Sequence, residues 1–168
     1  MSTQKNEMID PVCMMIVDAE ALHVEYLGLH FYFCSEQCRE RFVANPHLYT
    51  GKPGQRSPKQ QGVHVIKQRV IRLELPATEA VKVLLVEGLM SMMGIKEVNI
   101  ENDLIRIRYD LLEATAEQIE KTIEQSDTKL GRIWKERLKR AFVHYIEETE
   151  LENLENQHES HGCHHNDK

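Results

Sequence analysis

The segment GKPGQRSPKQQG, residues 51–62, constrains the fold of this chain more than any other feature. It holds two prolines, three glycines and no large apolar residue, a composition typical of an exposed linker. The segment predicts a small cysteine-bearing module over residues 8–50 and a larger domain over residues 63–130. The length of 168 residues suits one ordinary domain or two small ones.

The composition excludes several classes of function. A formal net charge of -6 argues against a general nucleic-acid binder, because neutralising phosphates needs a basic surface. The start of the chain lacks the apolar core of a signal peptide, and no apolar run approaches the roughly 20 residues that span a bilayer. We therefore expect a soluble, cytoplasmic protein. Its four cysteines are then expected to be thiols or metal ligands rather than structural disulfides.

Within the module, the stretch ALHVEYLGLHFYFC predicts a β-hairpin that turns at residues 27–28. Ser35 is a suitable N-cap for a short helix through Ala44. Cys34 then lies at the end of a strand and Cys38 in the first turn of the helix, so both sulfurs point to one place. The partial positive charge of the helix N-terminus favours thiolates, which are the metal-binding form.

Cys13 follows a turn-forming Asp-Pro-Val and can add a third sulfur. Three thiolates suit a soft or borderline ion such as Zn²⁺ or Cu⁺. A redox pair is an alternative, although the familiar oxidoreductase spacing is Cys-x-x-Cys; packing in a small core without metal is another. For the fourth ligand we favour His23, because a two-residue turn places it opposite Tyr32 and diagonal to Cys34. Asp10 and His47 are weaker candidates, and we expect a surface role for each.

The motifs DPVC, HFYFCSEQC and RFVANPHLY, within residues 10–49, resemble the YHS domain, which is related to TRASH-type metal-binding modules. The resemblance implies a small treble-clef-like module that binds heavy metals and is often fused to metal-pumping ATPases or sensors. It also implies metal ligands at Cys13, Cys34 and Cys38. The glycine that usually follows the first cysteine of the family is Met14 here, which either strains the turn or adds a thioether near the metal.

Residues 63–127 predict the order β-α-β-β-α. The strands are VIRLEL, IKEVNI and LIRIRY, with a turn at residues 101–103 between the last two, and Gly94 ends the first helix. Thr115 and Gln118 predict a capping box for the second helix. This gives five of the six elements of a ferredoxin-like domain, and TKLG could supply a short final strand. We therefore predict an α+β chain: the metal module, a ferredoxin-like βαββα(β) domain and a long C-terminal helix.

The same region resembles heavy-metal-associated domains in the sequence pattern of two stretches, GIKEVNIENDLIRIRYD and ATAEQIEKTIEQS. That family holds its ion in a Cys-x-x-Cys loop, which here reads LPATEAV. The resemblance implies a degenerate domain that keeps the fold, lacks the ion site and could dock a partner. Met90, Met92 and Met93 lie at the end of an apolar helix, so we expect them to fill the core rather than bind copper. No catalytic carboxylate pair, phosphate-binding loop or Ser-His-Asp set is visible, so we expect no enzyme.

A long helix is predicted over residues 131–157. Basic residues crowd its first half and acidic residues its second, so both ends oppose the helix dipole. An antiparallel copy would place opposite charges side by side, and we hypothesise a homodimer through this helix; the alternative is a helix docked on its own domain. One side of the helix carries Trp134, Leu138, Ala141, Phe142 and Tyr145.

The tail over residues 158–168 offers nitrogen donors and one thiol that can wrap a divalent or cuprous ion loosely. The weaker ligands in it are His158, His161, Cys163, His164 and His165. An inert tail is the alternative.

Together these features predict a protein that binds zinc or copper in metal trafficking, buffering or resistance, without catalysis. A metal-exporting P-type ATPase or another metal-handling protein is the expected partner. The alternatives are an adaptor protein stapled by structural zinc and, less favoured, a thiol redox protein.

Overall fold

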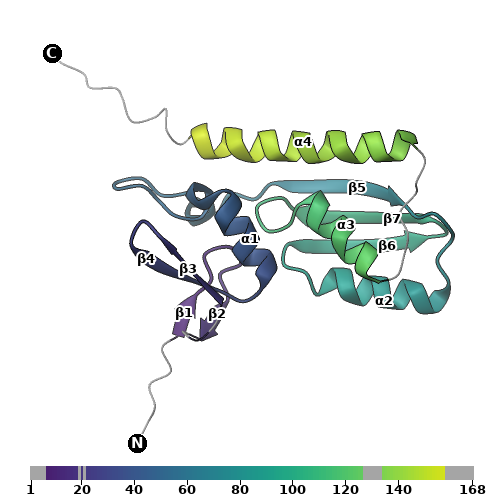
Figure 1. Ribbon diagram of the computed structural model, residues 1–168, viewed down its shortest axis with the longest axis horizontal. Coiled ribbons are helices and arrows are strands. Elements are labelled where there is room, and N and C mark those ends of the chain that lie inside the picture. Colours follow the sequence, from purple (N-terminus) through teal and green to yellow (C-terminus); the bar gives the residue numbers. More distant parts are fainter. Residues whose placement is uncertain (1–6, 19, 21, 127–133, 158–168) are drawn as a thin grey trace, which may run out of the picture.

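The computed structural model describes residues 7–18, 20, 22–126 and 134–157. Two β-hairpins and a short helix lie at one end of the molecule, and a sheet with its helices lies at the other (Figure 1). This arrangement confirms the predicted α+β class. No helix in the described part of the chain is long and apolar enough to cross a membrane.

The N-terminal part consists of two antiparallel hairpins and a helix. In the second hairpin His23 pairs with Tyr32, as the two-residue turn predicts. Ser35 caps the helix by accepting a hydrogen bond from the backbone N–H of Cys38. The elements are β1 (Glu7–Ile9), β2 (Ile16–Asp18), β3 (Leu22–Tyr26), β4 (Leu29–Phe33), α1 (Glu36–Ala44) and the 3-10 helix η1 (Pro46–Leu48).

An aromatic cluster holds the second hairpin against α1. The ring of the buried Phe42 lies 4.7 Å from that of Phe31 and 5.2 Å from that of Phe33, centroid to centroid. Tyr26 meets Phe42 edge-on at 5.9 Å, and the ring of Tyr49 lies 6.2 Å from that of Phe42. Aromatic pairs at these separations stabilise beyond the area they bury, so the end of β4 and the start of α1 are held in a fixed relation.

The second part is a three-stranded antiparallel sheet in the order β5-β7-β6. Ile71, Ile105 and Ile107 are buried on the face that the helices cover, whereas Arg106 and Arg108 are exposed on the other. The elements are the 3-10 helix η2 (Lys59–Gln61), β5 (Ile66–Arg72), α2 (Glu79–Met90), β6 (Ile95–Glu101), β7 (Leu104–Asp110), α3 (Ala116–Gln125) and α4 (Trp134–Gln157).

The predicted order β-α-β-β-α is confirmed, as is the capping box of α3 at Thr115 and Gln118. Three strands form this sheet in the described part of the chain, and the weak final strand predicted at residues 128–131 lies outside it. Assignment to the ferredoxin-like fold therefore stays a prediction.

Helix α4 docks on its own chain and runs along β5 (Figure 1). The buried carboxylate of Glu147 accepts hydrogen bonds from the Tyr109 hydroxyl and from the backbone N–H of Ala116, in the first turn of α3. Glu155 similarly accepts the backbone N–H of His47 at 2.9 Å. Acidic residues that oppose the dipole of their own helix thus satisfy the N-terminal N–H groups of neighbouring helices.

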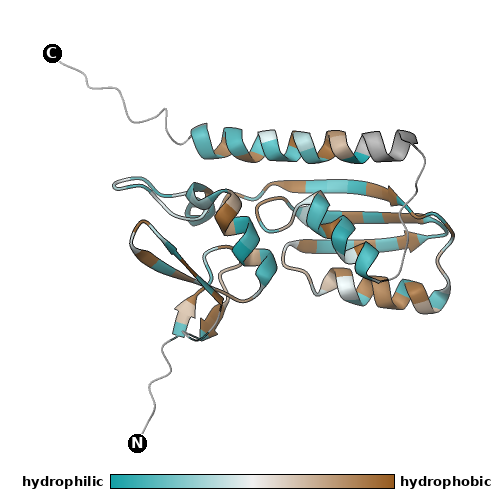
Figure 2. Cartoon of the chain, viewed as in Figure 1, coloured by the Kyte–Doolittle hydropathy of each residue, from teal (hydrophilic) through white to brown (hydrophobic). Residues whose placement is uncertain are grey.

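The side of α4 that docks is not the one on which Phe142 and Tyr145 lie. Phe142 and Tyr145 are 62% and 65% exposed, and hydrophilic and hydrophobic residues alternate along this helix (Figure 2). The docked side instead carries Glu147 and Leu151, four residues apart and both buried. Hydrogen bonds to Tyr109 and α3 decide which side faces the sheet, and the predicted homodimer stays a prediction.

Two further expectations need correction. The linker segment is not uniformly exposed: Ser57 is 2% exposed, and Lys59 forms an ion pair with Glu113 of the second part. Met90 does not fill the core, since it is 48% exposed at the end of α2. Met92, in the segment after α2, is by contrast half-buried against the core, as is its neighbour Met93.

Candidate metal centre

Three thiols from three segments of the chain meet in one place. Cys13 lies in the turn between β1 and β2, Cys34 follows β4, and Cys38 is in the first turn of α1. The sulfur of Cys34 lies 3.5 Å from that of Cys13 and 3.6 Å from that of Cys38. Thiolates around a tetrahedral zinc ion, each about 2.3 Å from it, lie about 3.8 Å apart, so the three sulfurs are near ligand spacing.

Asp10 belongs to this cluster, and the expectation of a surface role for it was wrong. Its side chain is fully buried. One carboxylate oxygen accepts the backbone N–H of Val12 at 2.8 Å and the other that of Cys34 at 2.8 Å. The carboxylate thereby ties the first turn to the end of β4. An Asp before Pro is typical of such side-chain-to-backbone turns, which is the signal in DPVC that could have indicated this role.

A ligand atom of Asp10 lies within 4.8 Å of each of the three sulfurs, and each sulfur lies within 4.8 Å of the other two. Among the described residues His23 is not part of this group; its ring lies 5.9 Å from that of Tyr32 and 6.1 Å from that of His30, on an exposed part of the hairpin. His47 is likewise engaged elsewhere, with the Tyr26 hydroxyl at 3.2 Å.

The turn that carries Cys13 adopts a backbone conformation that favours glycine. Met14 has a φ of 65°, and its N–H donates to the carbonyl of Asp10 at 2.8 Å. A non-glycine residue in this left-handed region is strained. The side chain of Met14 is 57% exposed. The missing family glycine therefore leaves strain in the turn.

The three thiols are linked by hydrogen bonds, and their burial disfavours the negatively charged form. Burial raises the pKa of Cys34 to about 11. Hydrogen bonding to Cys13, together with burial, raises the pKa of Cys38, while the same contact lowers the pKa of Cys13. A group of hydrogen-bonded thiols next to a buried carboxylate is a site that a cation stabilises strongly. The donor set of soft thiolates and one carboxylate oxygen fits a transition-metal ion.

Residues 8–52 match the family model of the YHS domain. This part of the chain is a YHS domain. No curated protein and no solved structure matches the chain. The resemblance of the second part to heavy-metal-associated domains accordingly stays a prediction.

The YHS domain is joined to the second part beside the thiols. Gln37, between Cys34 and Cys38, donates from its amide nitrogen to the carbonyls of Met93 at 2.8 Å and Glu113 at 2.9 Å. Its amide oxygen accepts the N–H of Met93 at 3.2 Å. The same short segment thus carries two of the thiols and holds the second part of the chain.

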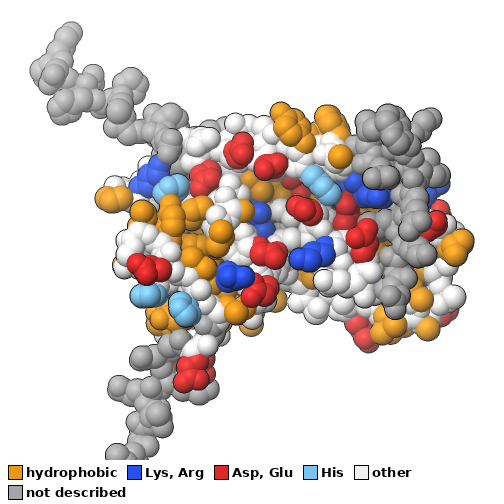
Figure 3. Space-filling model, in the orientation of Figure 1, with side chains coloured by type: hydrophobic (Ala, Val, Ile, Leu, Met, Phe, Trp, Pro, Cys, Tyr) orange, Lys and Arg blue, Asp and Glu red, His pale blue; other side chains and the backbone are white. Residues whose placement is uncertain are grey.

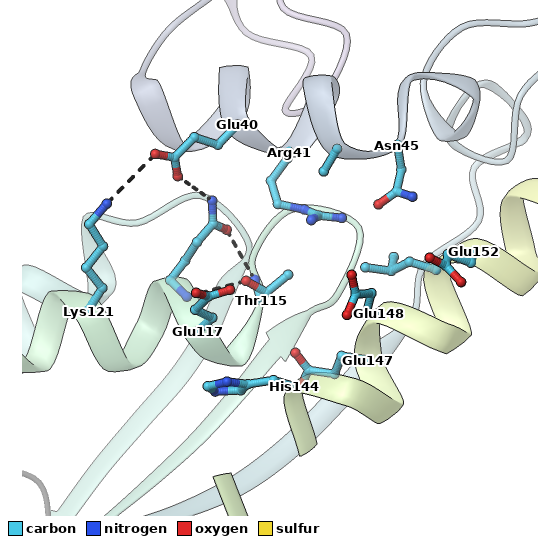
Figure 4. A pocket seen from close by; sticks show the side chains of 13 residues that line it. Glu40, Arg41, Asn45, Thr115, Glu117, Lys121, His144, Glu147, Glu148 and Glu152 are labelled. Carbon is cyan, nitrogen blue, oxygen red and sulfur yellow. Dashed lines mark hydrogen bonds and ion pairs between the residues drawn. The ribbon is translucent and has the colours of Figure 1, made fainter. Parts of the chain in front are cut away.

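A hollow of about 440 Å³ lies between α1, α3 and α4. Figure 4 shows Arg41 reaching into it from α1, with Glu148 and Glu152 on the facing side of α4. Arg41 is 5% exposed, and its Nε and Nη2 have no hydrogen-bond partner in the part of the chain that the structure describes. The hollow lacks the thiols of the metal centre.

The two parts of the chain differ in the kinds of side chain that they expose on this face. Hydrophobic side chains gather over the hairpins of the YHS domain, whereas acidic and basic side chains intermingle over α3 and α4 (Figure 3). The five predicted ligands of the tail, His158, His161, Cys163, His164 and His165, lie outside the described residues.

Proposed function

We propose that this protein binds a transition-metal ion, zinc or copper, in its YHS domain and serves in trafficking, buffering or resistance without catalysing a reaction. The convergence of Cys13, Cys34 and Cys38 on one place, beside the buried Asp10, is the observation that carries the proposal. The group is built from three separate segments, and buried anionic groups of this kind are stabilised by a cation.

Exposure of part of the cluster supports a role in handling rather than in permanent storage. Cys13 and Cys34 are only partly buried, whereas Cys38 is fully buried. A partner's thiolates could therefore replace the two accessible ligands in turn. We propose a metal-exporting P-type ATPase or another metal-handling protein of the cytoplasm as that partner.

Elemental analysis of protein purified without metal-affinity resin tests the proposal. Wild-type protein is expected to retain about one zinc or copper ion per chain, held by the thiols. Cys34→Ser should lose it. Cys163→Ser, which changes the thiol of the tail, is the matched control and should keep the ion. A folded wild-type protein that takes up no ion from added zinc or copper would contradict the proposal, as would full retention by Cys34→Ser.

Two further measurements, transfer of the bound ion to a chelator and mild oxidation of the thiols, distinguish metal delivery from a structural zinc site and from a redox role. Transfer of the ion to a competing chelator with the fold retained supports delivery, whereas loss of the fold on removal would assign a structural staple. A reversible disulfide between Cys34 and Cys38, found by mass after mild oxidation of metal-loaded protein, would favour a redox role instead.

A further inference from the structure

A cleft of about 340 Å³ opens beside the metal centre at the junction of the two parts. Three methionines from two separate segments line it together with the thiol-bearing Cys34 and three polar residues. The lining is Met15, Cys34, Ser35, Gln37, Ser91, Met92 and Met93. Cys34 is therefore shared between the three-thiol cluster and this cleft.

The methionines are brought to the cleft by specific contacts. Met93 is held on both sides of its backbone by Gln37, through its N–H at 3.2 Å and its carbonyl at 2.8 Å. Met92 follows the end of α2, where its N–H donates to the carbonyl of Leu89. Met15 belongs to the turn of Cys13, and its carbonyl accepts the N–H of Asp10 at 2.9 Å. Each thioether thus comes from a segment tied to the metal centre or to the end of α2.

Core packing accounts for only part of this arrangement, because Met92 and Met93 pack against the core and also line the cleft. Met15 is 48% exposed, and Met92 and Met93 are only partly buried. Thioethers are soft, uncharged ligands that favour monovalent ions such as Cu⁺ over Zn²⁺. They add no negative charge beside a cluster that already carries a buried carboxylate.

We propose that this cleft is a second metal site, which takes a soft monovalent cation between Met15, Met92, Met93 and Cys34 and adjoins the three-thiol cluster. The inference rests on the proposed metal-binding function and narrows it to Cu⁺ chemistry. An ion bound in the cleft exchanges with the cluster through the sulfur common to both sites. The route needs no redox step, because the ion keeps its charge throughout.

Methionine methyl NMR with Ag⁺, a redox-inert stand-in for Cu⁺, tests the site directly. In protein labelled at the methionine methyl carbons, one equivalent of Ag⁺ beyond the filling of the cluster should shift the signals of Met15, Met92 and Met93. Met14 and Met90 are the internal controls: they are 57% and 48% exposed but do not line the cleft. Unshifted cleft signals, or equal shifts of all five, would overturn the proposal.

Affinity measurements give an independent readout. Met92→Leu/Met93→Leu keeps the side-chain volume nearly constant and should lower the affinity for the second Ag⁺ at least about tenfold. Its affinity for Zn²⁺ should stay within about twofold, and Met14→Leu/Met90→Leu should change neither. Zinc bound at the cluster with no second Ag⁺ would overturn the cleft site and leave the proposed function standing. Binding of neither ion would overturn both.

Discussion

Met14 stands where the resemblance to the YHS domain implies a glycine, and the cost of its side chain in this turn is measurable. Its φ of 65° destabilises the folded state of a residue with a side chain by about 1–2 kcal/mol. Glycine avoids this strain, but its greater freedom in the unfolded chain offsets part of the gain. Met14→Gly should therefore raise the free energy of unfolding by about 0.5–1 kcal/mol. Urea unfolding of the metal-free protein measures this.

Met14→Leu is the matched control, because it keeps the strain and removes the thioether. Its stability should lie within about 0.5 kcal/mol of wild type. Equal metal affinity of the glycine, leucine and methionine forms would show that the thioether of Met14 is not a ligand. A Met14→Gly protein less stable than wild type would contradict the strain argument.

His144 predicts a pH dependence that does not involve the metal centre. Its Nε2 lies 3.0 Å from Glu120, and this contact raises its pKa above the ordinary 6.5, although burial and the nearby Arg69 oppose the rise. Arg140, on its own helix, also faces the Glu120 carboxylate, at 3.6 Å. Because the folded pKa is raised, the stabilisation is complete below pH 6.5 and is lost as the pH rises through the folded pKa.

The test compares the free energy of unfolding of wild type and His144→Gln between pH 5.5 and 8.5 in the metal-free state. The difference should be largest at the acid end and shrink toward the alkaline end, with a total change of less than about 1 kcal/mol because the pair is partly solvated. A difference that grows with pH would show that neutral His144 is the stabilising form.

At the level of elements, Gly94 fixes the path of the chain from α2 into the sheet. It has a φ of +85°, and a Cβ there would lie 2.6 Å from the Cβ of Glu113. Its carbonyl accepts the N–H of Asp110 at 2.9 Å, so the backbone has little room to move. Gly94→Ala should combine strain with overpacking.

Gly54 offers the matched control, since it has a φ of +80° with nothing near its Cβ position. Gly54→Ala should cost about 0.5–1 kcal/mol, which is the backbone strain less the entropy that glycine has in the unfolded chain. Gly94→Ala should cost about 1–3 kcal/mol more, from the added contact. Thermal and urea unfolding of the two variants give the comparison, and equal losses would mean that Glu113 moves aside at little cost.

The elements that were predicted correctly depend on local chemistry. The hairpin turn at residues 27–28, the Ser35 cap and the Thr115 capping box are each determined by neighbours within a few residues. The docked side of α4 was not predicted from the sequence, because its partners, such as Tyr109, lie far away in sequence. The same limit applies to Asp10, whose burial depends on Cys34, 24 residues further on.

At the scale of the whole molecule, the YHS domain and the sheet share one hydrophobic core. Buried residues of both belong to a single contiguous cluster. The fully buried side chain of Tyr49 donates its hydroxyl to the carbonyl of Leu112 at 2.6 Å, and Gln37 donates to Met93 and Glu113 beside the thiols. Residues 51–62 mark a change in composition, yet the two parts they join are packed on one another.

This coupling predicts that an ion bound in the YHS domain stabilises the distant sheet. Zinc at a free concentration of about 100 times its dissociation constant raises the free energy of unfolding by about 2.7 kcal/mol for any part of the chain that unfolds together with the zinc site. In native-state hydrogen exchange, the amides of Ile105 and Ile107 in β7 should therefore slow by about 100-fold, as much as that of Phe42 in α1. Gln37→Ala/Tyr49→Phe removes contacts between the parts and should confine the effect to α1. If zinc does not change the exchange rates of the β7 amides in wild type, the two parts unfold independently. Zinc binding stabilises a segment only when that segment unfolds in the same step as the zinc site.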